Sequence, residues 1–243
     1  MKIDVVVVTK NSMIPCLPEC IKAIYDNVPL NRLIVVDGGS TDGTIEFLTE
    51  FPNVVIIDDS KGNRGTARQK GIEKAGTEWF AFVDSDVVLC DKWFEKISKQ
   101  ITGRVGAIEG RVQRLYEKRP PKIKPSGRGL THCTLIRRSA VQKINIPPEM
   151  HVMEDQFIRR YIEKQGYLWL KAFYPISKHF QAELFGEDLN STRMSGKMIG
   201  KYDLLPLWKD IAVLAKFPFK NNRERKALLY KLIGRLEGML CKH

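Results

Sequence analysis

The sequence predicts an α/β fold with a doubly wound, mostly parallel sheet and a basic helical extension at the C-terminus. Two observations lead to this expectation. Short runs rich in Val and Ile alternate with segments of helical length in the first half of the chain, which is typical of βαβ units. Residues 193–243 are strongly basic and end in a segment with apolar residues at helical spacing.

Four strands are expected in the first half of the chain. They lie at 3–8, 33–37, 54–57 and 79–83, with helices at 18–27, 44–51, 65–75 and 92–100. Strands that are apolar along their whole length are covered by helices on both faces in parallel sheets. Residues 1–86 are therefore predicted to form a nucleotide-binding half, with its ligand outside the carboxyl ends of the strands.

The second half, residues 87–192, is less regular and is predicted to complete the same domain. Strands are expected at 105–115 and 131–136, with a loop at 116–129, a helix from Ser139 and a turn at 147–148. A further helix at 154–165 is ended by Gly166. In the basic tail, 193–243, apolar stretches lie at 204–208 and 211–219, and a helix is expected at 227–240.

The net charge of +12 is concentrated in the tail, where 12 basic and four acidic side chains between 193 and 243 leave +8. Such a surface suits an anionic membrane, a nucleic acid or a phosphorylated acceptor. Trp208, Phe217 and Phe219 among lysines are typical of an interfacial segment. The alternative is that the tail packs on the domain with solvated basic faces.

Cysteine usage and hydropathy bear on the compartment. The five cysteines are scattered without a zinc spacing, so we expect free thiols in a reducing compartment. The apolar run near the N-terminus is too short for a secretion signal, and no run approaches the roughly 18 apolar residues of a membrane span. The expected location is cytoplasmic, with peripheral attachment to the cytoplasmic face of the membrane as an option.

Carboxylates follow two of the predicted strands. Asp37 leads into a glycine turn, where a carboxylate can bind a base or ribose and glycines let a ligand approach the backbone. Asp84 and Asp86 lie two residues apart after the fourth strand, and a divalent cation on a diphosphate needs such hard oxygen ligands. The alternatives are a tight turn for Asp37 and a solvated acidic loop for the pair.

Two further positions carry charge toward the strand ends. Arg68, on the helix before the fourth strand, has the geometry to bind a base edge or a pyrophosphate. It is also compatible with a solvated helix face. Glu154 and Asp155 begin the helix at 154–165, a place that acidic residues favour for structural reasons as well.

Five ordered segments make the pattern specific: VVVTKN, VVDGGSTDGT, GNRGTARQKGI, FVDSD and MEDQFIRRYIEKQGY. Together they resemble the family 2 glycosyltransferases over roughly residues 1–180. The resemblance implies a GT-A fold over residues 1–192, with 87–192 as its acceptor-side half, and the use of nucleotide diphosphate sugars with inversion at the anomeric carbon.

The resemblance implies roles for seven residues. Donor binding falls to Thr9 beside the nucleoside, Asp37 and Arg68 at the base, and Asp84 at the ribose. Asp86 would hold Mn²⁺ or Mg²⁺ and Asp155 would be the general base. His179 stands where GT-A enzymes often add a metal or phosphate contact, although a lone histidine is also commonly structural.

The sequence departs from the family pattern at Gly38, where a second aspartate is usual, and at Gln69, where asparagine is usual. The QxxRW motif of processive synthases is not found in it, so one sugar is expected per reaction. The resemblance favours a UDP-sugar, then a GDP-sugar, with a hydroxyl acceptor on a glycan or a lipid-linked molecule and no nucleic acid partner. The alternatives are a sugar-phosphate nucleotidyltransferase and a non-catalytic nucleotide- or membrane-binding module.

Overall fold

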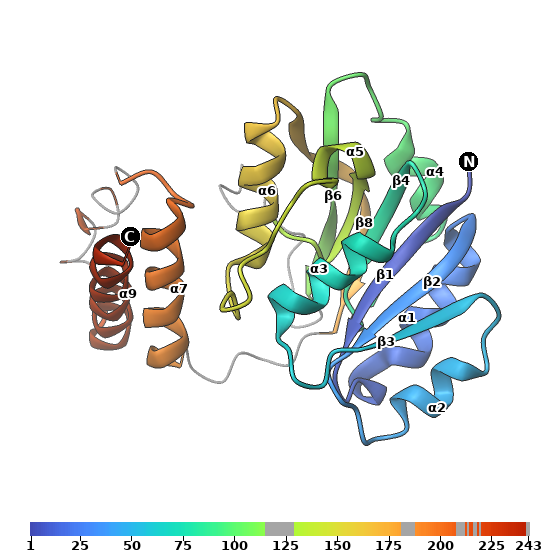
Figure 1. The fold of residues 1–243 in the computed structure, drawn as a ribbon, viewed down its shortest axis with the longest axis horizontal. Coiled ribbons are helices and arrows are strands. Elements are labelled where there is room, and N and C mark those ends of the chain that lie inside the picture. Colours follow the sequence, from blue (N-terminus) through green and yellow to red (C-terminus); the bar gives the residue numbers. More distant parts are fainter. Residues whose placement is uncertain are drawn as a thin grey trace.

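The computed structural model describes residues 1–114, 129–180, 188–207, 212, 214–215, 218 and 220–241. Within these ranges a mixed sheet carries helices on both faces, and two long helices stand to one side of it (Figure 1). The loop predicted at 116–129 lies outside the described residues except for Gly129. Trp208, Phe217 and Phe219 also lie outside them.

Among the described residues the sheet has eight strands, and it divides into a parallel part and a mixed part. In spatial order they are β3 (Val54–Asp58), β2 (Leu30–Asp37), β1 (Ile3–Thr9), β4 (Trp79–Val83), β7 (Cys133–Arg137), β6 (Val105–Arg114), β8 (Leu168–His179) and β5 (Val87–Val88). The first four are parallel to one another, β7 runs antiparallel to β4 and β6, and β8 is parallel to β6. The predicted parallel arrangement of the first four strands is therefore confirmed, and the role of residues 1–86 as a nucleotide-binding half stays a prediction.

Helices cover both faces of the sheet, as expected from its apolar strands. One face carries α1 (Met13–Asn27), α2 (Thr44–Thr49) and α4 (Trp93–Ser98), and the other carries α3 (Arg64–Lys74), α5 (Arg138–Val141) and α6 (Glu154–Lys164). The side chains of successive strand residues point to opposite faces of the sheet, so that Val5 packs with α1 and Val6 packs with α3. Apolar burial on both sides fixes the register of the sheet.

A close contact between α3 and β1 sets the position of the charged residues on α3. A Cβ atom at Gly71 would lie 2.4 Å from Val6 Cγ1, so only glycine lets the helix approach the strand this closely. Asn63 caps the helix by accepting hydrogen bonds from the backbone N–H groups of Gly65 and Thr66. The side chain of Arg68, one turn into α3, is buried at the sheet as a result.

The tail forms a pair of helices, α7 (Leu189–Tyr202) and α9 (Asn222–Leu240). Met198 and Ile199 of α7 share an apolar cluster with Ile158 and Ile162 of α6, so α7 packs on the domain. α9 packs on the far side of α7 (Figure 1). Helix α7 crosses the predicted division at 192/193, which stays a prediction.

Several elements differ from the sequence expectation. β8, the two-residue β5 and α7 were not expected, and α9 begins at Asn222 instead of residue 227. α1 begins at Met13 instead of residue 18, with non-helical backbone at Ile14 and Cys16. All five cysteines are free, as predicted. In the described part of the chain, no helix combines the length and hydropathy that a bilayer crossing requires.

Candidate active site

The loop after β2 is organised around the carboxylate of Asp37. Its Oδ1 accepts hydrogen bonds from the hydroxyls of Thr9 (2.9 Å) and Ser40 (2.5 Å), and its Oδ2 accepts from the backbone N–H groups of Gly39 (2.9 Å) and Ser40 (2.8 Å). Burial opposes the charge, but the bonds from Ser40, Thr9 and Gly39 keep the Asp37 pKa below its ordinary value. The structure thus places Thr9 and Asp37 together and engages both carboxylate oxygens within the loop.

A cavity of about 300 Å³ opens beside this loop. It is lined by Val8, Thr9, Lys10, Gly38, Asp59, Gly62, Asn63, Arg64, Ala67 and His151. Its volume lies at the lower end of the range for small-molecule sites. Asp59 is its buried acid, bonded by the Thr66 hydroxyl at 2.7 Å and by Lys70 Nζ at 2.8 Å. Sequence reasoning missed Asp59 and His151, although the pair of aspartates after β3 was a usable signal.

The segment after β4 turns sharply and places Asp86 beside His179. The backbone N–H of Val87 donates to the carbonyl of Asp84 at 3.0 Å, and β5 then pairs with the end of β8, so that Val87 stands opposite His179. His179 Nε2 lies 3.1 Å from Asp86 Oδ2. The two predicted metal ligands are therefore neighbours, although they are far apart in sequence.

The pair of Asp86 and His179 fits a divalent cation. The 3.1 Å between Asp86 Oδ2 and His179 Nε2 is the length of a hydrogen bond, and it is also close to the roughly 3.0 Å between two ligands bound at right angles to Mg²⁺ at 2.0–2.1 Å. Among the described residues no group of three or more His, Cys, Asp or Glu side chains is arranged to hold a metal. A cation here would take its other ligands from phosphate oxygens and water, which is how Mg²⁺ is usually bound with nucleotides.

Arg68 joins the two sides of the site. Its Nη2 lies 3.1 Å from Asp84 Oδ1, and its Nε lies 3.2 Å from Asp155 Oδ1 and 3.6 Å from Glu154 Oε1. The guanidinium also stacks over the ring of Phe82, with 5.1 Å to the centroid. Burial opposes its charge, but the three carboxylates outweigh burial and hold the Arg68 pKa above its ordinary value.

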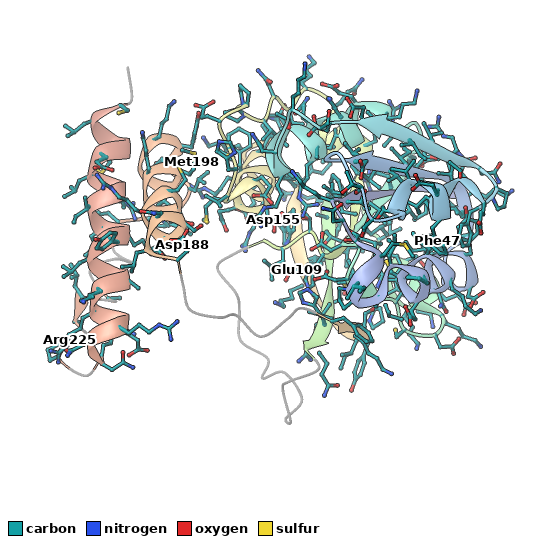
Figure 2. All side chains as sticks on the ribbon, turned by 90° about the horizontal axis from the view of Figure 1, so that it is seen from below. Phe47, Glu109, Asp155, Asp188, Met198 and Arg225 are labelled. Carbon is teal, nitrogen blue, oxygen red and sulfur yellow. The ribbon has the colours of Figure 1, made fainter. Side chains whose placement is uncertain are left out.

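Asp155 sits at the start of α6 with its carboxylate partly exposed. It accepts a 2.5 Å hydrogen bond from the hydroxyl of Thr131, which precedes β7. Figure 2 shows Asp155 and Glu109 in the middle of the molecule, between the part of the domain marked by Phe47 and helix α7 marked by Met198. Asp155 is thus fixed by Thr131 and Arg68 while one side of it remains accessible.

Two buried titratable groups complete the site, and sequence reasoning assigned neither. Burial, followed by the charge of Asp155, raises the pKa of Glu154 to about 7, although Arg68 opposes this. Burial lowers the pKa of His132 to about 4, so its imidazole is neutral near pH 7. The ring of His132 lies 6.3 Å from that of His179, and its carbonyl accepts the N–H of Asp84 at 2.9 Å.

Comparisons with known proteins place this geometry in context. A model of the glycosyl transferase family 2 matches residues 4–154. The glycosyltransferase AglE of Haloferax volcanii is 31% identical over 109 residues, covering 41% of this chain and 36% of AglE. The succinoglycan biosynthesis protein ExoA of Rhizobium meliloti is 32% identical over 99 residues, covering 35% of this chain and 30% of ExoA. The aligned segment spans about a third of each of these relatives.

Solved structures share the fold over nearly the whole chain. The mannosyltransferase PcManGT from Pyrobaculum calidifontis, in complex with GDP-Man and Mn²⁺, has a TM-score of 0.66 at 12% identity, covering 100% of this chain and 89% of PcManGT. S. aureus TarS 1–349 in complex with UDP-GlcNAc has a TM-score of 0.65 at 17% identity, covering 97% of this chain and 73% of the other. The expected GT-A fold is confirmed.

Proposed function

The chain belongs to the glycosyl transferase family 2, and from this premise we propose that it transfers one sugar from a nucleotide diphosphate sugar to an acceptor hydroxyl, with inversion. The observation that carries the proposal is the arrangement of charge around Arg68. Asp86 and His179 lie 3.1 Å apart and form one group, Asp155 is the other, and Arg68 contacts both Asp84, two residues before Asp86, and Asp155.

Inverting transfer needs these two groups of residues on opposite sides of the reacting carbon. The acceptor oxygen attacks in line with the departing diphosphate, so a base must face the acceptor while positive charge faces the leaving group. Asp155 would accept the proton of the acceptor hydroxyl as the new bond forms. Thr131 and Arg68 hold its carboxylate in place for this step.

Asp86 and His179 would hold a divalent cation, Mn²⁺ or Mg²⁺, against the diphosphate. When bound, the cation would neutralise charge that develops on the leaving group. The Mn²⁺ and GDP-Man of the PcManGT complex support a metal-dependent reaction of this kind. We propose that the cavity beside Thr9 binds the nucleoside. Asp84 would contact the ribose, and Asp37 and Arg68 would contact the nucleobase.

The donor and acceptor are proposed in order of support. The family resemblance favours a UDP-sugar and then a GDP-sugar, and the structural neighbours solved with UDP-GlcNAc and with GDP-Man are consistent with either donor. The acceptor would be a hydroxyl of a glycan or of a lipid-linked molecule, met in the cytoplasm at the membrane surface. No role for nucleic acid is proposed.

Metal-dependent nucleotide binding is tested by thermal shift. UDP or GDP with Mn²⁺ should raise the melting temperature of the native protein, because ligand binding stabilises the folded state by mass action. Asp86→Ala should lose the part of this shift that depends on Mn²⁺, and the exposed Asp91→Ala should keep it. If neither nucleotide gives any metal-dependent shift in the native protein, the transferase proposal fails.

The role of Asp155 is tested by Asp155→Asn. The variant should keep the nucleotide-induced thermal shift and lose about 10²–10⁴-fold in transfer rate, the usual contribution of a general base. Glu163→Gln, near the other end of α6, is the matched control and should transfer at the native rate. Turnover of Asp155→Asn at the native rate would remove Asp155 from this role, and nucleotide binding without transfer by the native protein would favour a binding module.

A further inference from the structure

The outer side of α9 is an apolar surface. Its exposed apolar side chains are Leu229, Tyr230, Ile233, Leu236, Met239 and Leu240. Leu229, Ile233, Leu236 and Leu240 follow one another at spacings of four, three and four, which places them on one side of the helix. Leu236 is 62% exposed and Leu240 is 78% exposed, so none of the described residues covers this row. We call these six residues the α9 face.

The opposite side of α9 is committed to α7, which fixes the direction of the α9 face. A Cβ atom at Gly200 would lie 2.1 Å from the carbonyl oxygen of Arg235, and one at Gly234 would lie 2.0 Å from that of Arg193. Backbone therefore meets backbone along this seam, and α9 cannot roll without opening it. The α9 face lies opposite this seam, and α7 lies between α9 and the rest of the domain (Figure 1).

Cations flank the α9 face. Arg223 and Lys226 are exposed on the first turns of α9, and the segment 193–243 carries a net charge of +8. Of the acids on α9, Glu237 is already paired with Arg193, and Glu224 caps the helix at Asn221. An apolar strip with basic residues beside it is the pattern of helices that lie in the surface of an anionic bilayer.

A second copy of the chain fits this surface less well. Helix α9 has 19 residues, about 28 Å in length, so one face of it would bury only a few hundred Å², against the roughly 800 Å² per partner of a stable interface. Parallel pairing would also bring the two basic first turns together. In antiparallel pairing, the basic first turn of each α9 would face the C-terminal end of the other α9, around Met239, where residues 238–241 include no acidic side chain.

We propose that the α9 face binds the surface of an anionic membrane, with its apolar side chains in the acyl boundary and Arg223 and Lys226 at the lipid phosphates. The domain then stands on the bilayer through α7, with α6 and Asp155 on the same side of the sheet as the tail. Acceptor hydroxyls carried by membrane lipids would be presented there, and this last step rests on the proposed function. The lipid contact itself does not depend on it.

The test is co-sedimentation of the full chain with vesicles. The native protein should sediment with vesicles of phosphatidylglycerol and phosphatidylcholine, and much less with phosphatidylcholine alone. Ile233→Gln/Leu236→Gln/Leu240→Gln should lose more than about tenfold in partition coefficient. Arg223→Gln/Lys226→Gln should lose about 25-fold at low salt, since each cation near such a surface contributes about fivefold, and the loss should shrink as salt is added.

Leu168→Gln/Tyr174→Gln is the matched control, because it removes exposed apolar side chains from β8 and should bind vesicles as the native protein does. The nucleotide-induced thermal shift is measured for every variant, so that misfolding and failure of the proposed function are seen separately from loss of lipid binding. If the variant Ile233→Gln/Leu236→Gln/Leu240→Gln sedimented with anionic vesicles as strongly as the native protein, the proposal would be overturned. The proposal would also be overturned if the native protein did not bind vesicles but formed dimers, and if the triple variant were monomeric. The α9 face would then be a contact between two copies of the chain.

Discussion

The buried carboxyl group of Glu154 should make the stability of the fold fall as pH rises. Its pKa is raised from 4.5 to about 7 by burial and next by the charge of Asp155, with Arg68 opposing. In the unfolded chain it ionises near its ordinary value. Glu154 therefore stabilises the folded state fully below about pH 4.5, and this contribution is lost as pH rises through about 7.

The size of the effect follows from the displacement of the pKa. A change from 4.5 to about 7, at about 1.4 kcal/mol per pH unit, corresponds to about 3 kcal/mol. Glu154→Gln keeps the shape of the side chain and carries no charge at any pH. The variant should therefore gain up to about 3 kcal/mol in unfolding free energy over the native protein between about pH 4.5 and pH 8.

Urea unfolding at about pH 5 and pH 8 measures this difference. Glu163→Gln is the control on the same helix, because it removes the same carboxylate from a side chain that pairs with Arg159 near the surface. A stability difference between Glu154→Gln and the native protein that is the same at both pH values would refute the reasoning. It would mean that Glu154 is ionised in the folded protein at both.

Two more substitutions test the close contact between α7 and α9 and the loop after β2 that is organised around Asp37. Gly200→Ala places a methyl group 2.1 Å from the Arg235 carbonyl and should cost about 1–3 kcal/mol by urea unfolding, whereas Gly103→Ala, with open space around it, should cost far less. A cost for Gly200→Ala no larger than for Gly103→Ala would contradict the close seam. Asp37→Asn should lower the free energy of unfolding by about 1–3 kcal/mol at neutral pH. Because the Asp37 pKa is lowered in the folded state, the stability difference between the variant and the native protein should narrow below about pH 4. A cost that stays constant into acid would speak against an ionised Asp37 as the centre of the loop.

The first half of the fold was predictable because each strand is a separate apolar run between turn residues. The predicted strand at 79–83 coincides with β4, and the predicted strand at 54–57 differs from β3 by one residue. β8 escaped prediction because Lys171 and Pro175 interrupt its apolar pattern, and its pairing with β6 shifts register within it. The two residues of β5 are too few to form any pattern.

The candidate site was predictable in its members more than in their contacts. Residue types at strand ends pointed to Asp37, Asp84 and Asp86, and the structure places them at one edge of the sheet. That Arg68 contacts both Asp84 and Asp155 depends on how α3, β4 and α6 pack, which sequence spacing does not reveal. Burial likewise decides the pKa of Glu154 and His132, and burial emerges only from the assembled fold.

The first turn of α6 is also tied to the tail. Gln156, next to Asp155, donates to the carbonyl of Leu204 just after α7, and Arg235 of α9 donates to the carbonyl of Leu205. With α9 on lipid, α7 would lie between the bilayer and α6 (Figure 1) and would hold Asp155 above the membrane surface. The tail would then favour lipid-linked acceptors whose head group raises the reacting hydroxyl to the height of Asp155. Acceptors whose hydroxyl lies at the membrane surface would be poorer substrates.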